Sequence, residues 1–472
     1  MAVFTKHPVS APPVAPVREK TGHLMLRGWC IVVLFLALSG ISWVNAIGTI
    51  GAGALLAASG IVSIVLWIVL RPQVQWRRLP WFPLGYALWA GLSISWSAWP
   101  GTSALTWLML LITSAQGLFV AAALTWHELV RGIASALKWC LGLSLVFELW
   151  VSVFVHGPIL PGFERPAHPM DPIVYWSRDN LFDGGRIQGI YGNANLLAVV
   201  CLVAIIVFGI RIAARAPRRL LLWVWMALAV YLLYRAESAT VYLSAVLVAI
   251  VLGTVLLMRT ARAPGARTKY YLLYAIVGVG GAATVWLLRD RVFGLLGRSA
   301  DLTGRERIWA AVLARAVERP FAGWGFATPW VTTDPHFTGW ILDHGQSVMQ
   351  AHNMWIDAFF QLGAVGVVLL ALTYLAFIWR SWFFAVDRPR FDLRADRPYT
   401  ALTLLPTLVA TVLLVQGLAE SEPLLLWGWM FVVMLGFKIK QAPLVGVGPA
   451  EQSLAIERGE RVLPETAPER AP

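Results

Sequence analysis

The feature that most constrains this chain is a long series of apolar runs. Hydrophobic residues make up 58% of its 472 residues and charged residues only 13%, which excludes an ordinary soluble domain and a disordered chain. Spanning the hydrocarbon core of a bilayer takes about 20 mostly apolar residues. Such runs lie at 28–46, 50–70, 80–98, 102–125, 132–155, 188–210, 219–235, 238–258, 270–288, 353–379, 399–418 and 423–438. The sequence therefore predicts an all-α polytopic integral membrane protein with about twelve transmembrane helices, and a lipid bilayer as its surroundings.

The distribution of Lys and Arg predicts the orientation of these helices. If the N-terminus is cytoplasmic, 26 of the 38 basic residues fall in inner segments and 11 in outer ones, as the positive-inside rule requires. Both termini are therefore expected in the cytoplasm, with residues 1–27 and 441–472 as tails and residues 28–440 as the membrane domain. Because the basic residues form short clusters between apolar runs, the net charge of +13 does not indicate nucleic-acid binding.

Two outer segments, 156–187 and 289–352, are much longer than a turn, and loops of this length usually carry function. In the longer one, Thr303 and Glu306 have the spacing of a capping box, and Pro320 ends the stretch that follows. Apolar residues lie between them at helical spacing: Trp309, Val312, Leu313 and Ala316. We expect an amphipathic helix before the tenth span, either on the membrane surface or packed on the bundle as a lid.

The same segment contains the histidines His336, His344 and His352. Their spacing lacks the tight His-x-x-x-His or His-Glu-x-x-His pattern of a metal site. We therefore expect neither a metal nor another cofactor.

Arg186 precedes the sixth span, and Gly192, Asn193 and Asn195 follow it at the start of the helix. A guanidinium beside a helix N-terminus is well suited to bind an oxyanion such as phosphate. The alternative is an arginine that reaches the lipid headgroups of the outer leaflet.

A polar stripe opens the tenth span, because Asn353, Asp357 and Gln361 lie four residues apart on a helix. An aspartate within the bilayer is costly and is expected to face protein or water. His352 lies at the mouth of this helix, and a histidine side chain, with an unperturbed pKa near 6.5, can transfer protons near neutral pH. A purely structural histidine is the alternative.

Three stretches carry a resemblance to a known family. They are GGRIQGIYGNANLLA (184–198), LTGRERIWAAVLARAVERPFAGWGF (302–326) and AHNMWIDAFFQLGAVG (351–366), and their strongest element is a His followed by ten residues and Gly, His352 to Gly363. In this order, and with the last two stretches enclosing a long outer loop, they resemble the O-antigen ligase and polymerase superfamily of bacterial envelope proteins.

The resemblance implies an inverting glycosyltransferase in the bacterial inner membrane, with its active site on the periplasmic side. Such an enzyme moves a glycan from undecaprenyl diphosphate to an acceptor hydroxyl. The acceptor is a lipid A–core sugar for ligases, a second repeat unit for polymerases, or a protein side chain for O-oligosaccharyltransferases. By the same resemblance, Arg186 and Arg305 bind the donor diphosphate, His352 is the catalytic general base, and no metal takes part.

Six further residues are candidates for supporting this site: Asn353, Asp357, Asn195, Arg235, Glu420 and Glu422. The chain departs from the family pattern at Gln361, where relatives often have an acidic residue. A twelve-helix secondary transporter and a non-catalytic scaffold remain as alternatives. The polar residues gather at the outer mouth and not at the bilayer midplane, which favours chemistry at the membrane surface.

Overall fold

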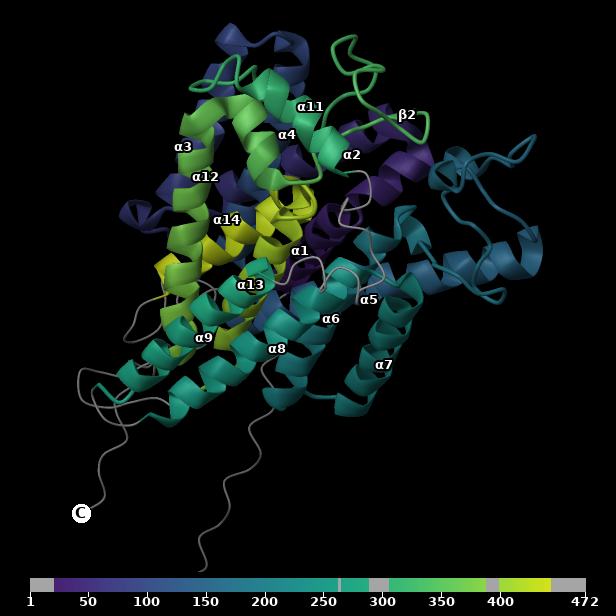
Figure 1. Ribbon diagram of the computed structural model, residues 1–472. Helices are drawn as coiled ribbons and strands as arrows, with labels where there is room; N and C mark the ends of the chain where they lie inside the picture. The colour runs from purple at the N-terminus through teal and green to yellow at the C-terminus, as the bar shows by residue number, and fades with distance from the viewer. Residues whose placement is uncertain (1–20, 262–264, 288–304, 388–398, 443–472) are drawn as a thin grey trace, which may run out of the picture.

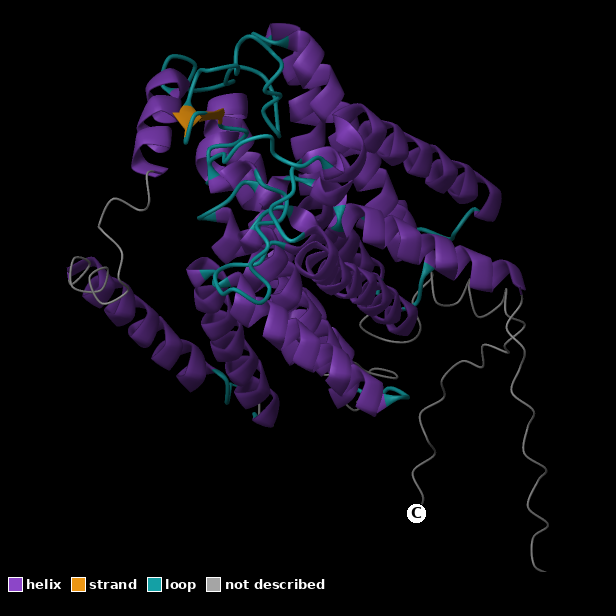
Figure 2. Cartoon of the chain, turned by 90° about the vertical axis from the view of Figure 1, so that its right-hand side faces the viewer, coloured by secondary structure: helices purple, strands orange, loops and turns teal. Residues whose placement is uncertain are grey.

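The computed structural model describes residues 21–261, 265–287, 305–387 and 399–442 (Figure 1). The chain forms helices α1 (Thr21–Leu38), α2 (Gly40–Leu70), α3 (Trp81–Leu92), α4 (Pro100–Ala123), α5 (Trp126–Trp150), α6 (Ala194–Ala213), α7 (Arg219–Ala236), α8 (Ala239–Thr260), α9 (Thr268–Leu287), α11 (Arg305–Ala316), α12 (Met354–Val386), α13 (Leu405–Gly417) and α14 (Leu426–Gln441). Strands β1 (Leu342–Asp343) and β2 (Gln346–Ser347) form a short antiparallel hairpin. In Figure 2 this hairpin lies among the loops beside α11.

The helices confirm the predicted class of an all-α polytopic membrane protein. Within the described residues, eight helices are long and apolar enough to cross a membrane, namely α1, α2, α4, α5, α6, α7, α8 and α12. The other four predicted spans coincide with α3, α9, α13 and α14, of which α3, α13 and α14 have only 12, 13 and 16 residues. Twelve membrane crossings therefore stay a prediction.

The boundary between the first two helices differs from the prediction, which placed it between residues 46 and 50. The helical boundary falls at Ser39, and α2 continues across the predicted outer turn. The turn itself is present inside α2, because Gly48 has a left-handed φ of 74° that a helix does not allow.

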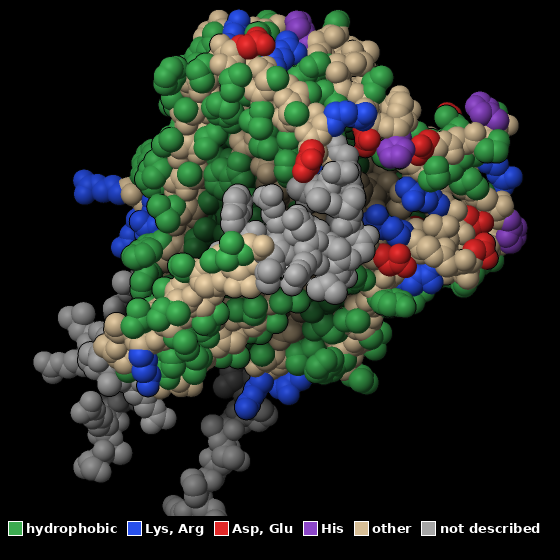
Figure 3. Space-filling model, in the orientation of Figure 1, with side chains coloured by type: hydrophobic (Ala, Val, Ile, Leu, Met, Phe, Trp, Pro, Cys, Tyr) green, Lys and Arg blue, Asp and Glu red, His purple; other side chains and the backbone are tan. Residues whose placement is uncertain are grey.

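The two ends of the bundle differ in charge. In Figure 1, α11, the hairpin and the start of α12 lie at the upper end, and the α6–α7 turn lies at the lower end. On the face drawn in Figure 3, the acidic and histidine side chains lie at the top and along the right side, and the charged side chains at the lower end are Lys and Arg. This distribution agrees with the predicted orientation, in which the lower end is cytoplasmic.

Helix α12 is broken at Gly363, where φ is 64° and ψ is −165°. The segment 320–325 fills the break with its own backbone. The carbonyls of Phe360 and Gln361 accept hydrogen bonds from Trp324 N and Gly325 N, and the N–H groups of Ala364 and Val365 donate to the carbonyls of Pro320 and Phe321. The polar stripe therefore lies on a short outer helix that is separate from the membrane-spanning part of α12.

Helix α11 packs on the bundle as a lid. Its buried face consists of Ile308, Val312 and Ala316, which join an aromatic core that includes Trp330 and Phe360. This arrangement favours the lid over a helix that lies on the membrane surface. Of the predicted apolar face, Val312 and Ala316 are buried, whereas Leu313 is 38% exposed. Thr303 of the predicted capping box lies outside the described residues.

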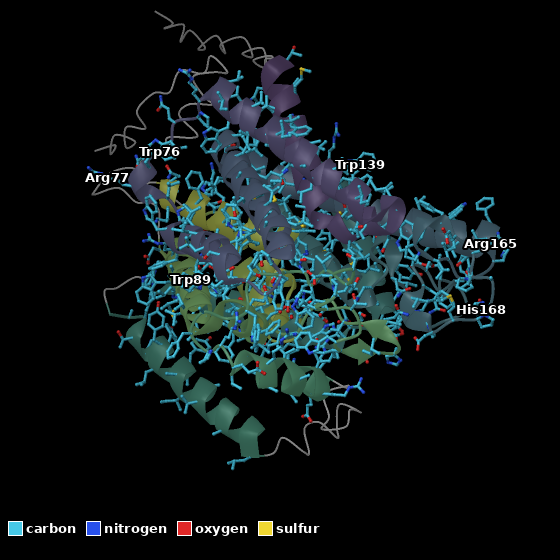
Figure 4. The ribbon with its side chains drawn as sticks, turned by 90° about the horizontal axis from the view of Figure 1, so that it is seen from above. Trp76, Arg77, Trp89, Trp139, Arg165 and His168 are labelled. Atoms are coloured by element: carbon cyan, nitrogen blue, oxygen red, sulfur yellow. The ribbon has the colours of Figure 1, made fainter. Side chains whose placement is uncertain are left out.

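The outer segment 156–187 projects to one side of the bundle, and Arg165 and His168 lie at its far edge (Figure 4). Glu148, near the end of α5, anchors the end of this segment. Its carboxylate accepts hydrogen bonds from Ser177 Oγ at 2.8 Å and from the backbone N–H groups of Gln188 and Gly189 at 3.0 and 2.7 Å. These bonds fix the backbone on both sides of Arg186.

Candidate active site

Glu420 lies in the turn between α13 and α14 and joins two of the predicted site residues. Its Oε2 atom is 2.7 Å from His352 Nδ1, and its Oε1 atom accepts a hydrogen bond from Arg305 at 2.8 Å. The side chain of Glu420 is only 7% exposed, whereas those of Arg305 and His352 are 20% and 27% exposed. The buried carboxylate therefore holds two partly exposed functional groups side by side.

The charge of Glu420 is maintained by its partners. Burial alone raises the pKa of this carboxyl, but the hydrogen bond and charge of His352 and the charge of Arg305 outweigh burial and hold the pKa below its ordinary value. Glu420 is therefore an anion at neutral pH. An anionic acceptor at Nδ1 favours the histidine tautomer with its proton on Nδ1.

The backbone at His352 directs its side chain to this position. His352 has a φ of 52°, a left-handed conformation that is uncommon for residues other than glycine and that concentrates at functional sites. With Nδ1 held by Glu420, the Nε2 atom has no hydrogen-bonding partner among the described residues. A neutral imidazole in this tautomer presents a lone pair at Nε2, which can accept a proton.

Gln350 completes the cluster and was not predicted. Its amide donates to Glu420 Oε2 at 3.0 Å and its carbonyl oxygen accepts from Ser421 N at 2.9 Å. Gln350 thus ties the segment before α12 to the turn that carries Glu420. The only feature of the sequence that pointed to Gln350 was its position two residues before His352. A glutamine at that position does not by itself indicate a chemical role.

Two predicted supporting residues have structural contacts. Asn353 is the N-cap of α12, accepting from the N–H groups of Trp355 and Ile356, and donates to the carbonyl of Leu418 at 3.2 Å. Asp357 is fully buried and accepts hydrogen bonds from Trp330 Nε1 at 2.9 Å and Gln361 Nε2 at 2.7 Å. Asp357 therefore faces protein, as the cost of burying a carboxylate requires.

Arg186 belongs to a second cluster, at the ends of α6, α7 and α8. It donates to Asn195 Oδ1 at 2.8 Å and to the carbonyl of Ala236 at 2.9 Å, and Ser238 Oγ also donates to Asn195 Oδ1. Arg235 holds the neighbouring loop through the carbonyl of Asn180 at 2.7 Å. Three of the predicted residues are thus brought together here. Within the described parts of the chain, no hydrogen bond or ion pair joins this cluster to Glu420.

The two clusters nevertheless lie at the same end of neighbouring helices. Helix α13 packs against both α6 and α8. Arg259, at the end of α8, donates to Thr403 Oγ1 just before α13, so these two helices run in opposite directions. The end of α13, which leads to Glu420, therefore points to the same end of the bundle as the start of α8, where Ser238 lies.

The remaining candidates are arranged differently. Burial and the charge of Glu420 raise the pKa of Glu422 to about 8, and its Oε2 atom is buried with no hydrogen-bonding partner among the residues that the structure describes. The three histidines of the outer loop do not converge. His336 contacts Asp334 at 2.8 Å and His344 contacts Asp171 at 3.1 Å, whereas His352 contacts Glu420.

Comparison with known proteins gives one family. Residues 224–371 match the O-antigen ligase family, and this region includes Arg305 and His352 but ends before Glu420 and begins after Arg186. Comparison with curated proteins gives no match. Members of this family are glycosyltransferase-like ligases, which agrees with a multi-pass membrane protein that acts on glycans. The match covers residues 224–371, about a third of the chain, and supports the O-antigen ligase superfamily for this protein.

Proposed function

We propose that this protein is a glycosyltransferase that moves a glycan from undecaprenyl diphosphate to an acceptor hydroxyl on the outer face of the inner membrane. The observation that carries the proposal is the contact of one buried carboxylate, Glu420, with both His352 and Arg305. It combines a group that can accept a proton with a cation that can bind phosphate, which are the two functions that this reaction needs.

His352 is the general base in this mechanism. Its Nε2 atom removes the proton from the acceptor hydroxyl as the hydroxyl oxygen attacks the anomeric carbon of the donor sugar. The resulting imidazolium is stabilised by Glu420 at 2.7 Å. General-base assistance of this kind is typically worth about 10²–10⁴-fold in rate.

The arginines serve the leaving group. As the new bond forms, the bond between the anomeric carbon and the phosphate oxygen breaks, and its electron pair remains on the undecaprenyl diphosphate. Glu420 accepts one N–H group of Arg305, and within the described residues the other donors of Arg305 are available for a phosphate oxygen. Arg186, at the same end of the bundle, is the candidate for the second phosphate. Attack opposite the leaving group inverts the anomeric configuration.

A ligase that attaches the glycan to a lipid A–core type sugar is the favoured form of this proposal. A polymerase and a protein O-oligosaccharyltransferase use the same donor and the same base. The three activities differ in the acceptor, so the attached product distinguishes them.

The test is mass spectrometry of lipid-linked and envelope-attached glycans in a deletion strain, complemented with wild type, His352→Ala or His344→Ala. His344 is the matched control, because it lies in the same outer segment and pairs with an exposed aspartate, Asp171. We expect attached glycan to be lost with His352→Ala and retained with His344→Ala, at equal amounts of protein in the membrane.

The pattern of the products decides between the activities. Long lipid-linked chains that persist without attachment indicate a ligase, and single repeat units indicate a polymerase. Glycans that are unchanged in the deletion strain would refute the glycosyltransferase, and solute transport would be tested next.

A further inference from the structure

A cluster of four cations lies at the opposite end of the bundle from Glu420. Lys138 and Arg131 belong to α5, Arg211 to the last turn of α6, and Arg218 to the turn before α7. The charges of all three arginines act on Lys138. Helix α5 packs against both α6 and α7, and Lys138 Nζ lies 5.9 Å from the ring centroid of Trp225 on α7. The four cations thus converge from three helices.

This cluster has no acidic partner in the described part of the chain. None of the four side chains forms an ion pair with Asp or Glu there. Glu128, the acid nearest to Arg131 on α5, is bonded to His23 at 2.6 Å and to Thr125 at 2.8 Å. Like charges that are held close together repel one another. The cluster is therefore complementary to an anion.

The position of Lys138 indicates the type of anion. It lies within the fifth apolar run, seven residues beyond Arg131, which is about 10 Å of helix rise. A lysine at this depth is expected to extend its charged end toward the membrane edge. In Figure 3, Lys and Arg side chains lie at the lower ends of α6 and α7, the end predicted to be cytoplasmic.

The cations border an apolar surface that is open to the surroundings. Trp139 is 61% exposed and points outward from the flank of the bundle (Figure 4). Trp223 of α7 is 56% exposed, and Leu143, one turn beyond Trp139 on α5, is 38% exposed. Phosphate-binding cations directly beside exposed aromatic and aliphatic side chains match the two parts of a phospholipid, its headgroup and its acyl chains.

We propose that Arg131, Lys138, Arg211 and Arg218 form a binding site for the phosphate group of an anionic glycerophospholipid in the inner leaflet, with its acyl chains against Trp139 and Trp223. This site is separate from glycan transfer and does not depend on it. A soluble phosphate would leave the exposed tryptophans without a role. The C-terminal tail, which lies outside the described residues, contains acidic residues that are an alternative partner for the cations. Such a partner would also leave the exposed tryptophans without a role.

The test uses the full-length protein in nanodiscs of phosphatidylcholine alone or mixed with phosphatidylglycerol. Native mass spectrometry measures how much phosphatidylglycerol stays bound, and thermal unfolding measures Tm. We expect phosphatidylglycerol to raise the Tm of the wild type. We also expect Lys138→Gln and Arg211→Gln each to lower retained phosphatidylglycerol by about fivefold, because one basic residue at an anionic surface contributes about that factor.

The matched control is Arg77→Gln, which removes a basic residue from another inner turn, where Figure 4 shows Arg77 pointing away from the bundle. It should leave the retained lipid unchanged. Equal retention in Lys138→Gln, Arg211→Gln and wild type would overturn the proposal. So would displacement of the lipid by inorganic phosphate alone, because the site would then bind a free anion. Using two single variants keeps the test valid if one of them fails to fold.

Discussion

His352 Nδ1 and Glu420 Oε2 lie 2.7 Å apart, although 68 residues separate them in the chain. The pair connects the start of α12 to the turn after α13. The pair fixes the tautomer of His352 and places a negative charge beside its ring. Both effects help His352 to take up a proton at Nε2. The first two predictions separate the role of this pair from that of the adjacent carboxyl group of Glu422.

Glu420→Gln should lower kcat for glycan transfer by about 10²-fold, with a smaller change in the KM for the donor. The amide oxygen can still accept from Nδ1, so His352 stays oriented, but the charge that stabilises the imidazolium is lost. The measurement is steady-state kinetics with purified donor and acceptor. His344→Ala is the control. An unchanged kcat would show that Glu420 only supports the fold.

Glu422→Gln should stabilise the protein at neutral pH. The pKa of Glu422 in the folded protein is raised to about 8 from an unfolded value near 4.5, by burial and by the charge of Glu420. The folded state therefore keeps a proton that the unfolded state has lost, and stability falls as the pH rises from about 4.5 to about 8. The side chain is not fully enclosed, so we expect a gain of about 1–3 kcal/mol and not the full value of the shift.

The check on Glu422 is Tm as a function of pH for the wild type and the variant. The two curves should coincide near pH 4.5 and separate by pH 8, with the variant more stable. Parallel curves over this range would contradict the assignment of the titration to Glu422.

The helices of this fold could be predicted because each is encoded locally. An apolar run of bilayer length contains its own signal, and helices occur at all twelve predicted positions. The helix over residues 305–316 could also be predicted locally, because apolar residues at helical spacing mark it. Members of the two clusters, such as Arg186 and His352, were selected because their sequence contexts resemble a family. The match of residues 224–371 supports that family, whereas the roles of the two residues stay a prediction.

The internal contacts of the site could not be predicted in this way. The break in α12 depends on backbone hydrogen bonds between the segments 320–325 and 360–365, some 40 residues apart. Nothing in the polar stripe distinguishes Asp357, which faces Trp330, from a residue that faces the active site. Pairing across such distances is set by tertiary packing, on which helical periodicity carries no information.

Gly363→Ala should destabilise the protein by more than about 2 kcal/mol. With a φ of 64° and a ψ of −165°, residue 363 lies in a backbone region that is essentially restricted to glycine and costs other residues roughly 1–3 kcal/mol. The added Cβ of residue 363 would also lie 2.3 Å from the backbone carbonyl of Phe321. Thermal unfolding and the yield of folded protein are the measurements. Gly280→Ala in α9 is the matched control, because its added Cβ meets no atom within 4 Å. Equal Tm values for the two variants would show that the break in α12 tolerates a side chain.

Asp357→Asn should lower stability without changing the chemistry of the site. Trp330 and Gln361 both donate to Oδ1 of Asp357, so an amide oxygen can keep these two bonds. The amide NH₂ group then replaces Oδ2, which accepts from the backbone N–H of Ala351 at 3.4 Å, so two donors face each other there. Leaving a buried donor unsatisfied costs about 1–3 kcal/mol. We therefore expect a lower Tm and less folded protein. The kcat per folded molecule should stay within about twofold of the wild type, which corresponds to a change of well under 1 kcal/mol in the activation barrier. The pH profile of kcat should be unchanged, because His352 keeps its contact with Glu420. A pH profile that shifts in Asp357→Asn while Tm stays constant would instead assign this buried carboxylate to the proton transfer itself.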